Sequence, residues 1–177
     1  LNIDDVLDAV LDAMKLSVEH DASNIMLLED EMLTIVRQRG YPTPLPNKIP
    51  LNAVQDIPIV YNSKKPLIIT DTRSYDIWKD DKDEVHGEIH WVRSNIKIPI
   101  IHDDVVIGIL LLDSTEPNKF TMGHADLLQT FANQVSIAVQ NARLYQAERQ
   151  QRILAEALQD SITVMNGTLD IDEVLDK

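Results

Sequence analysis

The side chains best suited to hold a polar ligand lie beside Trp91. The guanidinium of Arg93 can fork onto a carboxylate or a phosphate, and the indole of Trp91 can stack on a planar group. Ser94 adds a hydroxyl that both donates and accepts. The alternative to ligand binding is that Arg93 pairs with Asp71 or Asp113 and fastens the sheet. The candidate ligand-binding residues are Trp91, Arg93, Ser94, Asp71, Trp78 and Asp113.

Trp78 belongs to the segment Tyr75–His90, which is polar, charged and only weakly periodic. We interpret this segment as a helix or lid over one face of a sheet, because function often lies in such connections. Trp78 is then either a stacking platform for a ligand or a staple to the core.

No pattern typical of catalysis or metal binding stands out, so we predict no enzyme activity, no metal and no cofactor. The sequence has no Gly-rich phosphate loop and no Gly-x-Ser-x-Gly turn. The acidic run Asp80–Glu84 lacks the spacing of a calcium loop, and Glu88 between His86 and His90 makes no zinc-protease motif. Non-covalent haem held by His20, His86 or His90 stays an open alternative.

Composition excludes several classes of partner. The 177 residues carry a formal net charge of −13, which repels nucleic-acid phosphates and anionic membrane surfaces. There is no cysteine, no apolar run of some twenty residues and no signal segment, so we expect a cytoplasmic location without direct membrane contact. Because the first residue is Leu1, we expect a fragment of a longer polypeptide, in which membrane segments remain possible elsewhere.

Two apolar runs between Trp91 and Ser114 predict the hairpin that positions the candidate residues. Isoleucines alternate with other residues from Asn95 to Ile100, and Val105–Leu112 is apolar throughout, so we place the second run at the centre of a sheet with both faces covered. Gly108 indicates close approach by another backbone or a ligand, and Pro99 predicts a bulge or an unpaired side.

The rest of the first 70 residues predicts a helix, a second hairpin and a loop. Apolar residues at three- and four-residue intervals predict a helix capped by Asn2. The expected elements are a helix over Asn2–His20, strands over Ala22–Leu28 and Met32–Arg37, an extended loop over Gly40–Pro50, a short helix around Val54 and Ile57 before Pro58, and a short strand over Pro66–Ile69.

A long helix follows, from Gly123 to about Met165, with Thr121 as its cap. Beyond Arg143 the residues spaced by alternating steps of three and four form a coiled-coil-like seam. This seam predicts a homodimer through the C-terminal helix, and packing back onto its own domain is the alternative. The seam residues are Leu144, Ala147, Gln151, Leu154, Leu158, Ser161 and Met165.

The end of the chain repeats its beginning. Leu169–Asp176 matches Leu1–Asp8 nearly residue for residue, so we expect a tandem arrangement. The predicted organisation is a first domain over 1–146, a helical linker over 147–166 and the start of a second copy over 167–177.

Several stretches in order resemble the GAF domain, a small-molecule-sensing module of signalling proteins. They are NIDDVLDAVLDAM, RGY at 39–41, PLIITDT at 66–72, WVRS at 91–94, IPII, VIGILLLDS, FTMGHADLLQTFANQ and AVQNARLY at 138–145. The resemblance implies an α+β, PAS-like fold with a central antiparallel sheet of five or six strands. The first and last helices then cover one face, a ligand pocket lies on the other, and a long C-terminal signalling helix leads to an output domain such as a histidine kinase or a cyclic-dinucleotide enzyme.

The resemblance also narrows the range of possible ligands. Members that attach a bilin, and the free methionine sulfoxide reductases, use cysteines, which this sequence lacks. Cyclic-nucleotide-binding members carry an Asn-Lys pair where Asp113-Ser114 stands here, and two acids where His124-Ala125 stands here. We therefore expect a regulatory module that binds an unidentified small molecule. The alternative is a ligand-free dimerisation spacer, which would have its pocket filled by its own side chains.

Overall fold

A computed structural model describes residues 2–75, 78 and 89–175 of the chain. It contains two compact units, Leu1–Ala138 and Val139–Lys177. Most of the predicted lid Tyr75–His90 lies outside the described residues, as do Asp80–Glu84 and His86.

The first unit is built on a six-stranded antiparallel sheet with the order β3-β2-β1-β6-β5-β4. This α+β arrangement with a long last helix confirms the predicted fold class. The strands are β1 (Ala22–Glu29), β2 (Met32–Arg39), β3 (Lys48–Pro50), β4 (Leu67–Ile69), β5 (Ser94–His102) and β6 (Val105–Ser114). The helices are α1 (Ile3–Ser17), α2 (Ile57–Ser63), the 3₁₀ turn η1 (Thr72–Ser74) and α5 (Met122–Leu175).

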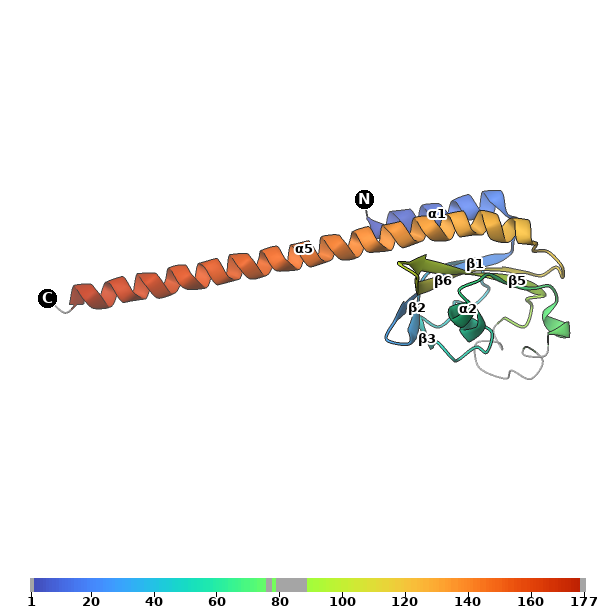
Figure 1. Cartoon of the computed structure of the whole chain (residues 1–177), viewed down its shortest axis with the longest axis horizontal. Coiled ribbons are helices and arrows are strands. Elements are labelled where there is room, and N and C mark those ends of the chain that lie inside the picture. The colour runs from blue at the N-terminus through green and yellow to red at the C-terminus, as the bar shows by residue number, and fades with distance from the viewer. Residues whose placement is uncertain (1, 76–77, 79–88, 176–177) are drawn as a thin grey trace. The chain divides into compact units, whose positions relative to one another are not determined.

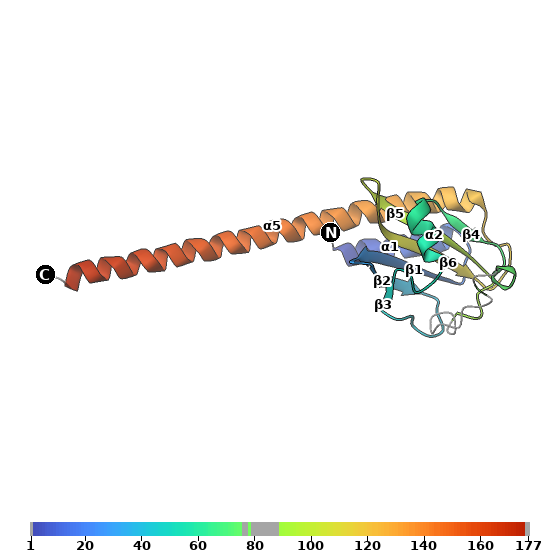
Figure 2. The same cartoon turned by 60° about the horizontal axis from the view of Figure 1, so that its bottom comes forward.

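Helices cover both faces of the sheet. The helix α1 and residues 122–138 of α5 lie on one face, and α2 lies on the other (Figure 1; turned in Figure 2). Buried apolar residues at helical spacing close the first face, so burial of one helix stripe fixes both helices there. These residues are Leu7, Val10, Leu11 and Met14 of α1, and Ala125, Leu128, Ala132 and Val135 of α5.

The hairpin of β5 and β6 is confirmed, with β6 at the centre of the sheet. In the connection only Asp103 and Asp104 form the turn, and both have positive φ, as a two-residue hairpin loop requires. A Cβ at Gly108 would lie 2.3 Å from the Met26 carbonyl oxygen, which confirms the predicted close approach of another backbone.

Pro99 lies beyond the end of β4, which pairs only with Asn95–Lys97. The Pro99 carbonyl accepts from Gln129 Nε2 of α5 at 3.3 Å, and Ser136 Oγ of α5 donates to the Ile101 carbonyl at 2.8 Å. The bulge in β5 falls between Ile100 and Ile101 and not at Pro99. The proline fits in β5 because no strand pairs with β5 on the β4 side at this residue.

The region before β4 differs from the prediction in two places. The helix α2 begins at Ile57 with Pro58 in its first turn, not before it, because a proline fits where no intrahelical N–H bond is needed. The loop over Gly40–Pro50 ends in a strand, β3, which pairs with the start of β2.

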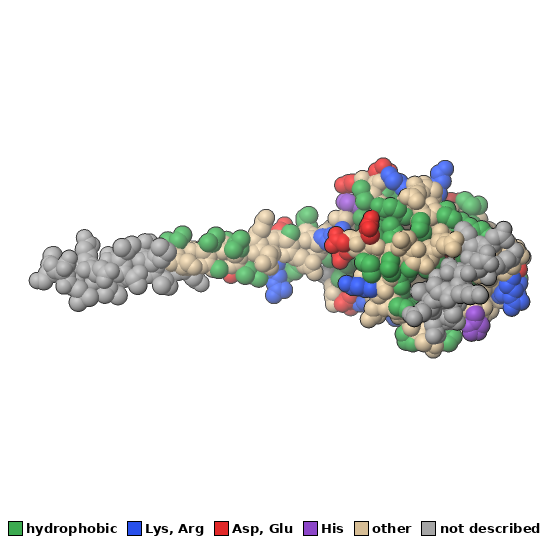
Figure 3. All heavy atoms as spheres, turned by 90° about the horizontal axis from the view of Figure 1, so that it is seen from below, with side chains coloured by type: hydrophobic (Ala, Val, Ile, Leu, Met, Phe, Trp, Pro, Cys, Tyr) green, Lys and Arg blue, Asp and Glu red, His purple; other side chains and the backbone are tan. Residues whose placement is uncertain are grey.

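The second unit consists of the continuation of α5, which runs without interruption to Leu175. The described side chains of its seam are exposed: Leu144 by 66%, Leu154 by 60% and Leu158 by 57%. Figure 3 shows hydrophobic side chains standing out along the described part of this helix. The side chain of Met165 lies outside the described residues, and the predicted repeat after 167 stays a prediction. In the part of the chain that the structure describes, no helix is long and apolar enough to span a membrane.

Candidate functional site

A cavity lies on the α2 side of the sheet, above the three central strands. In a strand successive side chains point to opposite faces, and the register places Asn24 of β1 and Lys97 of β5 on either side of Leu111 of β6. Asn95 and Asp113, two residues along, are opposite each other in the same way. The polar residues on this face therefore gather at one end of the sheet.

Apolar side chains form most of the cavity wall. The space open to the centre of a water molecule is about 40 Å³. The apolar lining comes mainly from the sheet, the loop before α2 and the first residue of α2: Met26, Ile35, Ile49, Val54, Ile57 and Leu111.

A buried ion pair lies at the cavity. Lys97 Nζ is 2.7 Å from Asp56 Oδ2, and the side chains are 2% and 0% exposed. Lys97 also donates to Asn95 Oδ1 at 3.1 Å and lies 5.8 Å from the centre of the Trp78 ring, while Trp78 Nε1 donates to Asp56 Oδ2 at 2.9 Å. Such extra bonds are needed because desolvation can exceed the attraction within a buried pair.

Asp113 is the second buried carboxyl of the cavity, and it is only partly satisfied. Tyr41 Oη donates to Asp113 Oδ2 at 2.7 Å, and Asn24 Nδ2 donates to Tyr41 Oη at 2.8 Å. Burial raises the pKa of Asp113 to about 7, against the opposing effects of the Tyr41 hydrogen bond and the Lys97 charge. Burial, and then the neighbouring Asp113 charge, raises the pKa of Tyr41.

Three polar atoms on cavity-lining side chains have no hydrogen-bond partner among the described residues: Asp113 Oδ1, Asn24 Oδ1 and Asn95 Nδ2. Their side chains belong to residues that are 2% exposed or less. Unpaired buried polar atoms cost about 1–3 kcal/mol each, and each of these three atoms is itself almost fully covered by protein.

Two of the six predicted ligand-binding residues, Trp78 and Asp113, line the cavity. Arg93 and Asp71 are not in its lining. They pair with each other: Arg93 Nη2 is 2.8 Å from Asp71 Oδ2, and Arg93 Nε is 3.2 Å from Asp71 Oδ1. Of the two roles that we considered for Arg93, this geometry matches the ion pair with Asp71 that fastens the sheet. Hydrogen bonding to Arg93 holds the pKa of Asp71 below its usual value.

Trp91 and Ser94 also lie outside the cavity lining. Trp91 packs at a tilt on Tyr41, with ring centres 6.2 Å apart. Ser94 is on the face opposite Asn95, and its hydroxyl donates to the Glu116 carbonyl at 2.6 Å. The alternation of β5 separates the two neighbours, so ligand binding by Ser94 would need a site other than this cavity.

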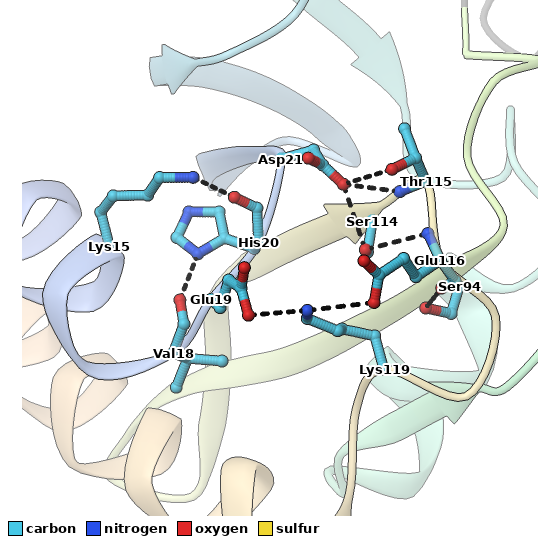
Figure 4. A network of polar contacts seen from close by, with 10 residues as sticks. All are labelled: Lys15, Val18, Glu19, His20, Asp21, Ser94, Ser114, Thr115, Glu116 and Lys119. Carbon is cyan, nitrogen blue, oxygen red and sulfur yellow. Dashed lines mark hydrogen bonds and ion pairs between the residues drawn. The ribbon is translucent and has the colours of Figure 1, made fainter.

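Ser94 instead belongs to a network at the corner where β1 and β6 meet their helices (Figure 4). Asp21 Oδ2 accepts from Thr115 N at 2.6 Å, Thr115 Oγ1 at 2.9 Å and Ser114 Oγ at 3.1 Å. Lys119 bonds both Glu19 and Glu116, at 2.9 and 3.2 Å. The network ties the chain before β1 to the chain after β6.

Two of the described histidines, His20 and His124, bond nearby backbone or cap residues. His20 is buried at the same corner, where its Nδ1–H donates to the Val18 carbonyl at 2.7 Å and burial lowers its pKa. His124 lies in the first turn of α5, where its N–H donates to the predicted cap Thr121. Among the described residues no group of three or more histidines and acids could hold a metal.

Sequence reasoning missed Lys97, Asn95, Asn24, Tyr41 and Asp56. One signal was available: Lys97 pairs with Leu111, in a strand that is apolar throughout and therefore covered on both faces. A lysine beside such a strand must be buried with a counter-charge. No comparable signal pointed to Asp56, which comes from the irregular stretch before α2.

Comparisons with known proteins agree with this geometry. The sequence profile of the GAF domain family matches residues 1–140, whereas no curated protein sequence is a significant match. Three solved structures are similar at low identity, which supports the fold alone. They are a GAF domain/HD domain protein from Geobacter sulfurreducens (TM-score 0.67, 12% identity, 81% of this chain and 95% of that chain), the GAF domain of a two-component sensor histidine kinase from Bacillus halodurans (0.67, 18%, 81% and 97%), and type II free methionine-R-sulfoxide reductase from Thermoplasma acidophilum (0.64, 16%, 80% and 96%).

Proposed function

Because the chain belongs to the GAF domain family, we propose that it is a regulatory module that binds a small molecule between the sheet and α2. The observation that carries this proposal is the cavity on the α2 side of the sheet, whose wall is mainly apolar and which is lined by residues of the sheet and of α2. The cavity is not filled by the protein's own side chains, which favours ligand binding over the spacer role.

We place the module in a signal-transduction protein. Its similarity to the GAF domain of a sensor histidine kinase supports a kinase-type output domain, and the lack of cysteine in the sequence supports a cytoplasmic location. Sensing then requires that the ligand bind one arrangement of α5 more tightly than another.

The proposed role is binding rather than catalysis. Reductases occur among the similar folds, and the resemblance implies cysteines for their chemistry. This chain has none, which supports a module that holds its ligand unchanged.

The proposed partner of the second unit is a second copy of the same chain. Leu144, Leu154 and Leu158 fall on one coiled-coil seam and are 57–66% exposed. Pairing of two such seams would bury them. In sedimentation velocity, the double variant Leu144→Asp/Leu158→Asp should shift the protein from dimer to monomer. The control Leu16→Asp, at a 90% exposed residue of α1, should stay dimeric, and a monomeric wild type would refute the pairing.

Native mass spectrometry of the purified full chain tests ligand binding. We expect a reproducible extra mass that is lost in Val54→Phe, which fills the cavity, and kept in Val105→Phe, the same change at a 59% exposed residue. An extra mass retained equally in both variants would place the ligand elsewhere. A dimer without extra mass, even after incubation with cell extract, would favour the ligand-free spacer.

A further inference from the structure

The charged side chain in the cavity lining is bonded within the wall. Lys97 Nζ donates to Asp56 Oδ2 at 2.7 Å and to Asn95 Oδ1 at 3.1 Å. Trp78 Nε1 donates to the same Asp56 oxygen at 2.9 Å. The Asp56 carboxylate already matches the charge of Lys97, so an anionic ligand would have to compete with a buried ion pair.

The polar group at the other end of the lining is closed in a similar way. Tyr41 Oη donates to Asp113 Oδ2 at 2.7 Å and accepts from Asn24 Nδ2 at 2.8 Å. The lining atoms without a partner among the described residues lie on Asp113, Asn24 and Asn95, and each is almost fully covered by protein. These side chains therefore offer a ligand very little polar surface to bond.

The surface that faces the cavity is mainly carbon. It comes from five buried side chains of one hydrophobic cluster: Met26, Ile49, Val54, Ile57 and Leu111. A water molecule is held in a protein only where it finds two to four polar partners, and an apolar cavity stays dry and takes up apolar guests. An apolar molecule would gain close contacts here without displacing well-bonded water.

The size of the cavity limits its guest further. About 40 Å³ is open to the centre of a water molecule, whereas clefts that hold drug-sized ligands measure roughly 300–1,000 Å³. An engineered apolar cavity of about 150 Å³ in another protein takes up benzene or xenon. The cavity therefore suits a guest of only a few heavy atoms.

Desolvation excludes small guests that carry a charge. A carboxylate or an ammonium loses its hydration on entering apolar surroundings, and this loss is repaid only where the wall supplies a counter-charge or hydrogen bonds. Even a hydroxyl group loses its bonds to water and finds little polar surface in return. The wall thus selects against polar molecules of the right size.

We propose that the ligand of this cavity is a small uncharged apolar molecule, of the size of a xenon atom or a three-carbon hydrocarbon, held by contacts with Met26, Val54, Ile57 and Leu111. This inference rests on the proposed function, because it names the chemical class that the same cavity takes.

The test compares three probes with equal chains, propane, propan-1-ol and propionate, and adds xenon as an apolar probe of another shape. Each is titrated into the full-length, isotopically labelled protein, and dissociation constants are taken from amide chemical shifts. We expect xenon and propane to shift the amides of Met26 and Leu111 in a saturable way. Propan-1-ol should bind at least tenfold more weakly than propane, and propionate should not bind.

Variants of Val54 test whether the probes occupy the cavity. Val54→Phe fills the cavity and should abolish the shifts caused by xenon and propane. The matched control Val105→Phe, at a 59% exposed residue, should leave both dissociation constants unchanged. Val54→Ala enlarges the cavity and should bind benzene at least tenfold more tightly than the wild-type protein does. This gain of binding keeps the test decisive if Val54→Phe does not fold.

The outcomes separate the two proposals. If propan-1-ol or propionate binds as tightly as propane, the apolar class is overturned and the cavity remains a binding site. If no probe shifts the amides of cavity residues, the apolar class is overturned as well, and native mass spectrometry decides the proposed function. An extra mass that Val54→Phe loses would keep the cavity as the site of a different molecule, whereas the absence of any such mass would overturn both proposals.

Discussion

Asp21, which directly precedes β1, lies beside Asp113 of the neighbouring strand β6. Their side chains nevertheless have different environments. The Asp21 N–H donates to the Asp113 carbonyl at 2.9 Å. At the corner, three hydrogen bonds to Asp21 hold its pKa below the usual value despite some burial. In the cavity, burial raises the pKa of Asp113 to about 7, and one of its oxygens has no partner among the described residues.

This difference separates polar groups that bond several partners near the surface from deeply buried polar groups that keep unpaired atoms. The corner network lies nearer the surface, and its bonds join the chain before β1 to the chain after β6. The cavity cluster is deeper and leaves atoms unpaired, which is a cost that a stable fold would avoid without a reason. The predictions below break or sharpen this contrast, beginning with the largest effect.

The largest effect is expected at the buried ion pair. Lys97→Met should lower the free energy of unfolding by about 3–5 kcal/mol, because it leaves the Asp56 charge buried and uncompensated. Urea unfolding at pH 7 measures this loss. Adding Asp56→Asn should recover most of it.

A matched control is the exposed pair Lys64–Asp104, whose atoms are 2.6 Å apart. Lys64→Met should cost about 0.5 kcal/mol or less. Equal losses at Lys64 and Lys97 would contradict the distinction between buried and exposed pairs.

Asp113 should make stability fall as pH rises. Its pKa in the folded state is about 7, above the ordinary value of 3.8, so the folded protein holds this proton more tightly than the unfolded chain does. The free energy of unfolding therefore decreases between about pH 4 and pH 7. The stability of Asp113→Asn relative to wild type should rise by up to about 1.4 kcal/mol per pH unit in this window. A difference that stays flat from pH 4 to 7 would show that Asp113 is not buried as described.

Asp21 should show the opposite sign and a smaller effect. Its pKa is lowered, so its contribution is present above the usual pKa of an aspartate and is lost as pH falls through the folded value. Asp21→Ala removes the acceptor of three hydrogen bonds and should cost about 2 kcal/mol at pH 7. Thermal unfolding measures it against Asp12→Ala on the exposed side of α1. A loss of stability no larger than that of Asp12→Ala would show that the corner network does not stabilise the fold.

The smallest effect is expected at Lys119. It bridges Glu19 and Glu116, both largely exposed, so Lys119→Met should change stability by about 0.5 kcal/mol and less in high salt. Unfolding at low and high salt tests this, and a large salt-independent loss would contradict it.

Periodicity and turn chemistry predicted most of the fold. The apolar run at β6 and the stripe on α1 are local signals, and each was placed correctly. The short elements were less predictable: β3 and α2 are stabilised by long-range contacts that no local pattern records, as the pairing of β3 with β2 shows.

The site was harder because it depends on side chains from distant segments. Asp113 and Trp78 were predicted, but the partners of the buried charges come from Asn24, Tyr41 and Asp56, each in a different part of the chain. Arg93 shows the opposite kind of error. Its guanidinium is suited to bind a ligand, and only the fold shows that this group is already paired with Asp71.

The edge of the sheet beside Pro99 has a consequence for the protein's behaviour at high concentration. An exposed strand edge is a template for adding a strand from another molecule, which is how many sheet proteins begin to aggregate. Where β4 ends, Pro99 has no N–H to offer, and side chains of α5 already occupy the carbonyls of Pro99 and Ile101. The last helix thus protects this part of the β5 edge against strand addition, in addition to covering the core.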